Sequence, residues 1–423
     1  MKIRNVVISG SVKDFSNLFF SNLVQKLFGL IREPVVAFFF GSSLLYANYL
    51  LIRVIADFFS QFTVGNALKA NLLPKFTKIF ESHKNISLKS VAFFSKRIMI
   101  ILFCISLIIQ FLVIWLLDSS DYLILIFLAV LLSITICFNF LNTIYLTILQ
   151  SQGKFFDFSI ATTLNSFFVA IFIFPLTYLI GIFGLVFSRI IGILSITLRY
   201  VVPMNKNYVG HEVYLSKSDF NISTLILGNF ANIIILSASL VSGLDGKESI
   251  TYFTYSVFIL NALLTSVVGN ISTLLLRSVS IKKSNLFMLY SLFISVSVGI
   301  FLIIGLQFYS EQLIELVFMR GEFTRLDVQI TSIFIKKLSY AFIFIFISTT
   351  MFQPFFSLPL DTSNKIRKYL SFFFLTTIVI SFIIAVFLDL DVKDESLIMI
   401  YSSSIMSVFL SVYSYFYYLK YNK

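Results

Sequence analysis

The stretch IMIILFCISLIIQFLVIWLL at residues 98–117 decides the fold class of this protein. It carries no charged side chain, and as a helix it is long enough to cross the hydrocarbon core of a bilayer, which takes about 20 apolar residues. Only helices and closed barrels satisfy the backbone in lipid, and runs of this length are too long for barrel strands. The stretch therefore predicts a transmembrane helix.

Apolar windows of the same kind recur along the whole chain. They lie near residues 15–39, 45–67, 95–117, 122–149, 158–179, 181–202, 219–242, 250–275, 284–306, 328–352, 369–388 and 396–418. The composition agrees, because 58% of the residues are hydrophobic, 12% are charged and the mean hydropathy is +0.95, which excludes a soluble globular fold. We predict an all-α polytopic membrane protein with about 12 transmembrane helices.

The positions of lysine and arginine predict the orientation. With twelve spans and the N-terminus in the cytoplasm, 22 of the 32 basic residues fall in cytoplasmic segments and only four on the opposite side, as the positive-inside rule requires. We therefore expect a multi-pass protein of the cell inner (cytoplasmic) membrane with both termini cytoplasmic. The net charge of +12 does not indicate a nucleic-acid partner, because the basic residues are spread over short loops.

The connections between the spans leave little room for catalysis. The longest, near residues 68–94 and 307–327, are too short to fold a soluble domain. Both histidines lie in predicted cytoplasmic loops, and both cysteines lie inside apolar runs, where they are typical of core positions. We expect no enzyme activity, no cofactor and no metal site.

A weak internal repeat indicates two parallel halves. Two motifs of the second predicted span have counterparts in the eighth, namely YANY at 46–49 and VGN at 64–66, and YFTY at 252–255 and VGN at 268–270. A chance match stays open as an alternative, because tyrosine and asparagine are frequent. We expect an N-terminal six-helix lobe, residues 1–205, and a C-terminal six-helix lobe, residues 206–423, around a central cavity of the kind found in alternating-access carriers.

The first two predicted spans contain a cluster of charges in otherwise apolar sequence: Lys26, Arg32, Glu33, Arg53 and Asp57. Arg53 and Asp57 are four residues apart and share a helix face, and Lys26 and Glu33 are nearly two turns apart, which also places them on one face. Pro34 removes a backbone donor and predicts a kink beside Arg32.

Two interpretations of this cluster stay open. Charges within membrane spans usually face a cavity or a pathway, and a guanidinium matches phosphate oxygens bidentately, which predicts a hydrated cavity that binds an anionic headgroup. The alternative is ion pairing inside the bundle alone. Arg189, Lys336 and Lys337 are weaker candidates, because they can also extend to the membrane interface. For most embedded asparagines, such as Asn142, we expect hydrogen bonds between helices.

Two regions resemble the lipid II flippase family (MurJ/MviN) of the multidrug/oligosaccharidyl-lipid/polysaccharide exporter superfamily. GLIREPVVAFFFG at 29–41 resembles the family's G-F-x-R-[DE]-x-x-x-A-x-x-F-G, with Gly65 and Pro74 following downstream. FMRGEFTRLD at 318–327 and QPFFSLPLDTSNKIRK at 353–368 resemble two later family segments. Together with the order of the spans, the resemblance covers most of the chain.

The resemblance implies a central cavity that alternates between the two membrane faces and carries an undecaprenyl-diphosphate-linked sugar, with essential arginines in that cavity. It maps one of these arginines onto Arg32, with Glu33 at the adjoining acidic position. Two further family arginines align near Phe59 or Ser60 and near Ser256, which are uncharged, and family members usually have fourteen spans. Our hypothesis is that Arg53 or Lys26 supplies the missing positive charge.

The predicted function is a flippase that translocates an undecaprenyl-diphosphate-linked glycan, either lipid II or a related polysaccharide or O-antigen unit, by alternating access. The expected partners are the lipid-linked oligosaccharide and membrane lipids, with no nucleic acid, and a monomer is compatible with the sequence. Two alternatives stay open. One is a MATE-like multidrug/cation antiporter, which needs an embedded carboxylate for ion coupling, and the other is an inactive membrane scaffold, allowed by the incomplete arginine set.

Overall fold

The computed structural model describes most of the chain between residues 20 and 421. The segments outside this description are 1–19, 22–23, 26, 30, 65–71, 73–74, 78, 81–85, 118–120, 208–210, 216–220, 244–247, 265–267, 269–284, 359, 389–391 and 422–423. Helices dominate the described residues, and two residues each of β1 (Ile86–Ser87) and β2 (His211–Glu212) form a parallel pair. The predicted all-α fold class is confirmed.

The helices coincide with the predicted spans. After the helical residues 31–40 they are α2 (Leu44–Val64), α4 (Lys89–Leu116), α5 (Tyr122–Ser151), α6 (Phe155–Ile180), α7 (Phe183–Ile196), a π-helical turn (Thr197–Val201), α8 (Val202–Asn207), α9 (Ile222–Gly228), α10 (Phe230–Val241), α11 (Ser249–Leu263), α13 (Asn285–Phe318), α14 (Arg325–Met351), α15 (Gln353–Phe356), α16 (Leu360–Phe387) and α17 (Val392–Tyr421). Among the described residues, eight helices are long and apolar enough to cross a membrane, or nine if the bent pair α9 and α10 is one span.

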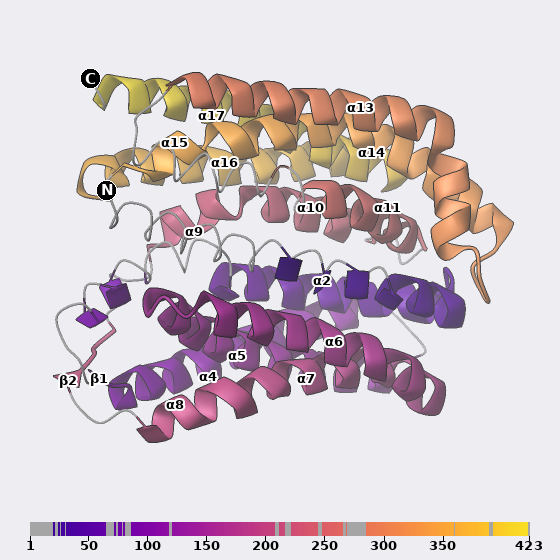
Figure 1. The fold of residues 1–423 in the computed structure, drawn as a ribbon. Helices are drawn as coiled ribbons and strands as arrows, with labels where there is room; N and C mark the ends of the chain where they lie inside the picture. The colour runs from indigo at the N-terminus through magenta and orange to yellow at the C-terminus, as the bar shows by residue number, and fades with distance from the viewer. Residues whose placement is uncertain are drawn as a thin grey trace. The chain divides into compact units, whose positions relative to one another are not determined.

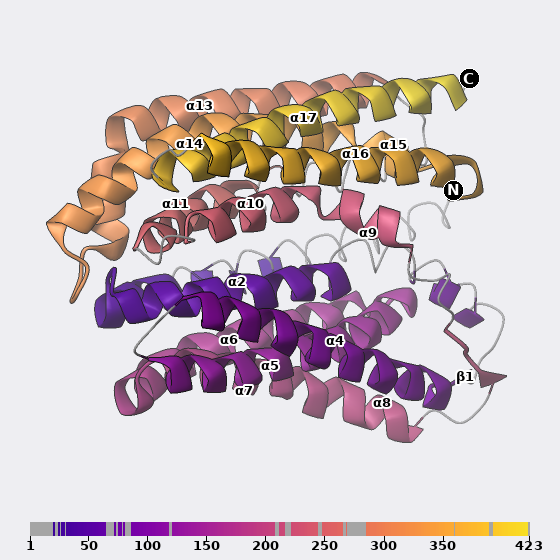
Figure 2. The ribbon, with the colours of Figure 1, turned by 180° about the vertical axis from the view of Figure 1, so that it is seen from behind.

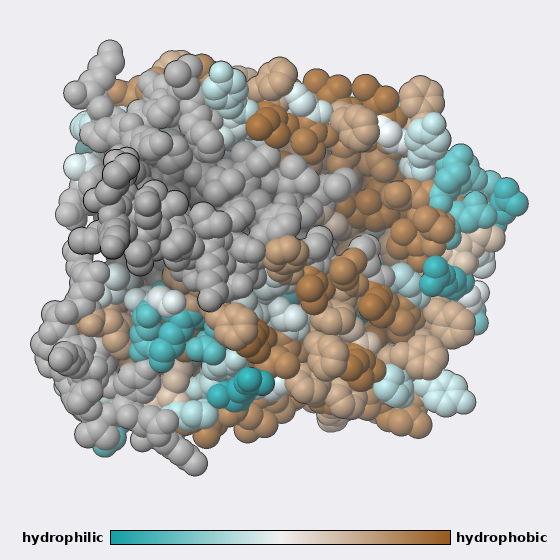
Figure 3. All heavy atoms as spheres, in the orientation of Figure 1, coloured by the Kyte–Doolittle hydropathy of each residue, from teal (hydrophilic) through white to brown (hydrophobic). Residues whose placement is uncertain are grey.

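The apolar side chains on the outside of these helices explain why the bundle needs a membrane. Large hydrophobic residues of α4, such as Ile100 and Trp115, are 65% and 72% exposed. Figure 3 shows hydrophobic side chains over much of the described surface on one face, along helices of both halves of the chain. Apolar surface on this scale is stable only against lipid.

Two local features differ from the sequence-based expectations. The predicted span 219–242 is broken, because α9 and α10 meet at 75° at Asn229. The predicted loop 307–327 is helical as far as Phe318, so that only a short turn precedes α14. At Pro34 the backbone is helical from residue 31 to residue 40, and the kink stays a prediction.

Contacts within the chain define two compact units. Unit 1 comprises Met1–Phe39 and Ile55–Leu225, and unit 2 comprises Phe40–Val54 and Ile226–Lys423. Within unit 1, α4, α5, α6 and α7 lie side by side, and within unit 2, α10, α11, α14, α16 and α17 pack together with α13 against α14 (Figures 1 and 2). The predicted lobe boundary between residues 205 and 206 stays a prediction.

Small and amide residues set the packing of unit 1. A side chain at Gly192 of α7 would meet the backbone oxygen of Asn165 in α6 at 2.8 Å, so the glycine permits a close approach of the two helices. Asn142 in α5 donates to the carbonyl oxygen of Ile193 and accepts from the hydroxyl of Thr197, both at 2.9 Å. The expectation that Asn142 joins helices is confirmed.

In unit 2 the turn between the first helix and α2 packs on the turn before α14. Gly41 has a φ of 49°, and a side chain there would overlap the backbone of Glu322. The carbonyl oxygen of Gly41 accepts from the Tyr255 hydroxyl at 3.3 Å. Thr324 and Asp327 form a capping box that begins α14, and the Asp327 carboxylate also accepts from the Tyr252 hydroxyl at 2.8 Å.

Candidate functional site

The first helix presents a charged pair in an apolar setting. Arg32 and Glu33 are neighbours in sequence, and the guanidinium curls back onto the adjacent carboxylate, with Nε donating to Oε1 at 2.9 Å. The Glu33 side chain is 3% exposed, whereas that of Arg32 is 27% exposed. The carboxylate is therefore buried, while part of the Arg32 side chain is accessible.

A second pair in unit 1 joins two helices that are far apart in sequence. Arg189 of α7 donates from Nη1 to Asp57 Oδ1 of α2 at 3.5 Å. The side chains of Arg189 and Asp57 are 18% and 35% exposed. Because a charged group within a membrane span is costly against hydrocarbon, the pair lowers the cost of embedding both side chains, and each keeps part of its surface accessible.

Asp57 pairs with Arg189, a partner that helical periodicity alone does not indicate. We expected Arg53 to share its helix face, and Arg189 was a weaker candidate for the site. Arg53 is half-buried and falls in unit 2, and Lys26 lies outside the described residues. Of the five predicted substrate-binding residues, Arg32 and Glu33 thus pair with each other and Asp57 pairs with Arg189.

The weaker candidates on α14 lie elsewhere. Lys337 approaches Asp394 of α17 at 3.4 Å, and both side chains are more than half exposed. An exposed pair of this kind contributes little. Lys336 and Lys337 belong to unit 2 and take no part in the pairs described for unit 1.

Unit 1 also carries an open groove of about 470 Å³ between the first helix and α6. Its lining includes four phenylalanines, among them Phe28 and Phe167, whose rings meet edge to face. On its floor Ser21 donates to the backbone oxygen of Ser159 at 3.0 Å. The described lining contains no charged side chain, so the groove is suited to apolar groups and not to a phosphate.

The sequence analysis did not assign a role to Arg367 of α16, which is buried. Its guanidinium donates to the Leu358 carbonyl oxygen at 3.1 Å and to the Ser363 hydroxyl at 2.9 Å, and it lies over the rings of Phe355 and Phe356. These bonds hold the turn before α16. Among the described residues, no three His, Cys, Asp or Glu side chains gather closely enough to hold a metal ion.

The long apolar helices and the charges embedded in them define a class of protein, namely polytopic all-α membrane proteins. The chain is similar in structure to the lipid II flippase MurJ in an inward closed conformation, with a TM-score of 0.74, 21% identity, and coverage of 96% of this chain and 87% of the flippase. The resemblance to the flippase family that the motifs indicated is thereby confirmed at the level of the fold.

Two further solved structures have the same fold. An inward-facing multidrug resistance MATE family transporter of the MOP superfamily gives a TM-score of 0.71 at 12% identity, with 94% of each chain covered. A MOP superfamily transporter from Pyrococcus furiosus gives 0.65 at 12% identity, with 97% of this chain and 95% of that chain covered. No protein-family model and no curated protein matches the sequence.

Proposed function

We propose that this protein is an alternating-access carrier that moves an undecaprenyl-diphosphate-linked glycan across the cytoplasmic membrane, with both of its termini in the cytoplasm. The observation that carries the proposal is the placement of Arg32 and of the Arg189–Asp57 pair in apolar helices of unit 1, with part of each side chain accessible. The fold, shared with a lipid II flippase and with multidrug transporters, is consistent with transport.

The chemistry of the site favours an anionic headgroup over a cation. A diphosphate offers several oxygens to a guanidinium, and each charge-assisted contact contributes roughly 1.5 to 3 kcal/mol. Arg32 and Arg189 each hold a carboxylate, so an incoming diphosphate can exchange with Glu33 or Asp57 as the partner of an arginine. The net positive charge of the protein then attracts the substrate. Without substrate, Glu33 and Asp57 pair with the two arginines, so that neither guanidinium is left without a counter-charge.

An antiporter is the second candidate, because the fold is also that of a MATE transporter and Asp57 is a carboxylate exposed by a third. Proton-coupled export of a cation requires a carboxylate that takes up and releases a proton. Both Asp57 and Glu33 are instead engaged by arginines. The geometry therefore favours the flippase.

The proposal is tested with purified protein in proteoliposomes that contain fluorescent undecaprenyl-diphosphate glycans, one with the lipid II headgroup and one with a polysaccharide repeat unit. We expect protein-dependent translocation of at least one of them, unchanged in Lys337→Gln, which removes an exposed cation from unit 2. A proton gradient that drives export of ethidium, with neither glycan moved, would instead establish the antiporter. If none of the three compounds is moved, the inactive membrane scaffold is the interpretation that remains.

A further inference from the structure

A second feature of unit 1 lies at the N-terminal end of α4, away from the residues assigned to the carrier. A hollow of about 360 Å³ opens there between the first two turns of α4 and the segment after β2. Its lining includes Lys89, Ser90, Phe93, Arg97 and Tyr214. Lys89, Phe93 and Arg97 are spaced four residues apart, so they lie on one face of the helix.

The charge of this hollow is positive. Lys89 and Arg97 are exposed, as is Lys96 beside them, and the Arg97 guanidinium lies 5.0 Å from the centre of the Phe93 ring. Lys75 adds a further cation, with its ammonium donating to the Tyr214 carbonyl oxygen at 2.9 Å. Among the described residues, no acidic side chain lines the hollow and no carboxylate pairs with Lys89 or Arg97.

The length of α4 places the hollow at the membrane surface. The helix has 28 residues, which at 1.5 Å per residue gives about 42 Å, or about 12 Å more than the hydrocarbon core. Trp115, 72% exposed, marks the far end of the apolar part, as aromatic residues do at membrane interfaces. The extra turns therefore lie at the near interface, where they carry the three basic residues.

An apolar stripe continues from the hollow along the same face of α4. Its exposed side chains follow Phe93 and Arg97 at helical spacing and are Ile100, Ile101, Cys104, Ile108, Leu112 and Trp115. A ligand with one anionic end and one apolar end would place its charge over Arg97 and Lys89 and its chain along this stripe. A free anion would contact only Arg97 and Lys89 and not the apolar stripe.

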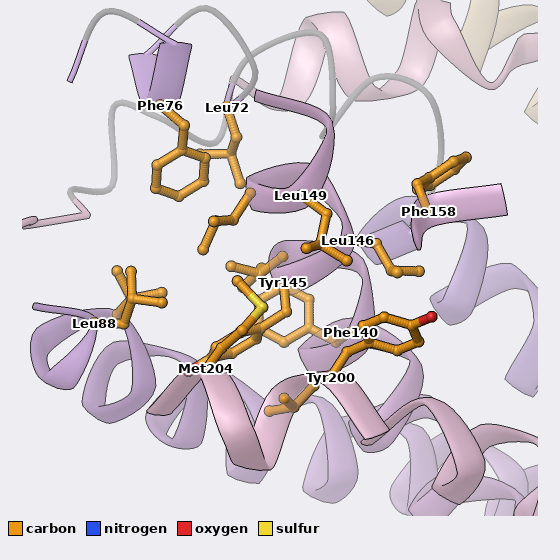
Figure 4. Packing of buried hydrophobic residues seen from close by; sticks show 14 of the residues in the cluster. Leu72, Phe76, Leu88, Phe140, Tyr145, Leu146, Leu149, Phe158, Tyr200 and Met204 are labelled. Atoms are coloured by element: carbon orange, nitrogen blue, oxygen red, sulfur yellow. The ribbon is translucent and has the colours of Figure 1, made fainter. Parts of the chain in front are cut away.

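The hollow borders a packed hydrophobic core. Leu88, Val91 and Leu215 belong to a buried hydrophobic cluster around Phe140 and Tyr145 of α5 (Figure 4). The parallel pairing of β1 with β2 fixes Ile86 and Ser87 against His211 and Glu212. The backbone that carries the basic side chains is thus packed against a buried core, so a ligand needs to order few groups of the protein when it binds.

We propose that this hollow is a binding site for the phosphodiester headgroup of an anionic phospholipid, with one acyl chain along the α4 stripe. Basic pockets at the cytoplasmic ends of membrane helices suit such headgroups, and the expected orientation places this end of α4 in the cytoplasmic leaflet. The site is separate from Arg32, Asp57 and Arg189, and it holds whether or not the protein is a flippase.

The test is lipid binding to the full-length protein, measured by native mass spectrometry from a neutral detergent with phosphatidylglycerol, phosphatidylcholine or inorganic phosphate added. The variant is Lys89→Gln/Arg97→Gln. The matched control is Lys154→Gln/Arg199→Gln, which removes the same charge from two exposed positions of unit 1 outside the hollow. Each surface cation contributes about fivefold to the affinity for an anionic lipid, so we expect a loss of roughly 30-fold for the variant.

Phosphatidylglycerol is expected to bind the native protein and the control alike, and phosphatidylcholine to bind all three proteins equally and more weakly. Equal phosphatidylglycerol affinity of the variant and the control would overturn the proposal. Full displacement of the lipid by millimolar inorganic phosphate would also overturn it, because it would identify a site for a free anion. The melting temperature without added lipid checks folding, and it should be the same for both double variants, since all four side chains are exposed.

Discussion

Replacement of Arg32 by alanine is expected to lower the rate of glycan translocation roughly 10- to 100-fold. We propose Arg32 as the cation that binds the diphosphate, because it stands in the motif and its side chain is 27% exposed. Loss of one charge-assisted contact of about 1.5 to 3 kcal/mol corresponds to a decrease of this size. The measurement is the initial rate in proteoliposomes, normalised to the amount of folded protein.

Two variants separate substrate binding from folding. Arg32→Ala also removes a partner of Glu33, a buried carboxylate, and so lowers stability. In Arg32→Ala/Glu33→Gln that charge is removed, and we expect the melting temperature to recover while translocation stays low. Arg32→Lys should give an intermediate rate of translocation, because lysine keeps the positive charge but lacks the planar guanidinium that can bind two phosphate oxygens at once.

The role of Arg53 is tested in the same way. Our hypothesis that Arg53 replaces one of the missing family arginines predicts a clear loss of translocation in Arg53→Ala. Wild-type translocation in both Arg32→Ala and Arg53→Ala would refute the binding of the diphosphate by these arginines.

Replacement of Gly41 by alanine is expected to destabilise the protein by about 3 kcal/mol or more. An alanine with φ near 49° costs about 1 to 2 kcal/mol, because its side chain crowds its own backbone. At this position the new carbon would also lie 2.8 Å from the carbonyl carbon of Glu322, so the turn before α14 would have to move. The measurement is the midpoint of thermal unfolding in detergent.

The chain offers a matched control for the backbone effect. Gly153 has a φ of 73°, and nothing lies within 4 Å of the position where a side chain would start. Gly153→Ala should therefore show the conformational cost alone, with a smaller decrease of the midpoint. Equal decreases in Gly41→Ala and Gly153→Ala would show that the contact with Glu322 does not matter for stability.

The positions of the helices could be predicted from the sequence because hydrocarbon demands long apolar runs. The end of α13 could not, since residues 307–318 mix polar and apolar side chains and continue the helix beyond the apolar window. The break at Asn229 was also missed. Hydropathy averaged over a window has the same value for a straight span and for two helices meeting at 75°.

The presence of charged residues within the helices could be predicted, but the pair of Arg189 with Asp57 could not. Helical periodicity indicates which side chains share a face of one helix, and it placed Asp57 with Arg53. It gives no information on Arg189, which lies 132 residues further along the chain and approaches Asp57 only through the packing of unit 1. Contacts of this kind depend on tertiary structure.

The motifs behind the family resemblance have structural roles in this chain. Gly41 ends the first motif and packs on Glu322 of the second, and Asp327 of the second begins α14. Arg367 of the third holds the turn between α15 and α16. Motif matches therefore predicted the fold well, whereas the binding of a substrate by Arg32 stays a prediction.

Whether the embedded charges of unit 1 face water is tested by chemical modification of a cysteine introduced at position 57. In a background without Cys104 and Cys137, Asp57→Cys is treated in proteoliposomes with a charged, membrane-impermeant methanethiosulfonate, and Ile101→Cys serves as the lipid-facing control. We predict that the thiol at 57 reacts, that undecaprenyl-diphosphate glycan slows its reaction, and that the thiol at 101 stays unmodified. A thiol at position 57 as unreactive as the one at 101 would contradict the account.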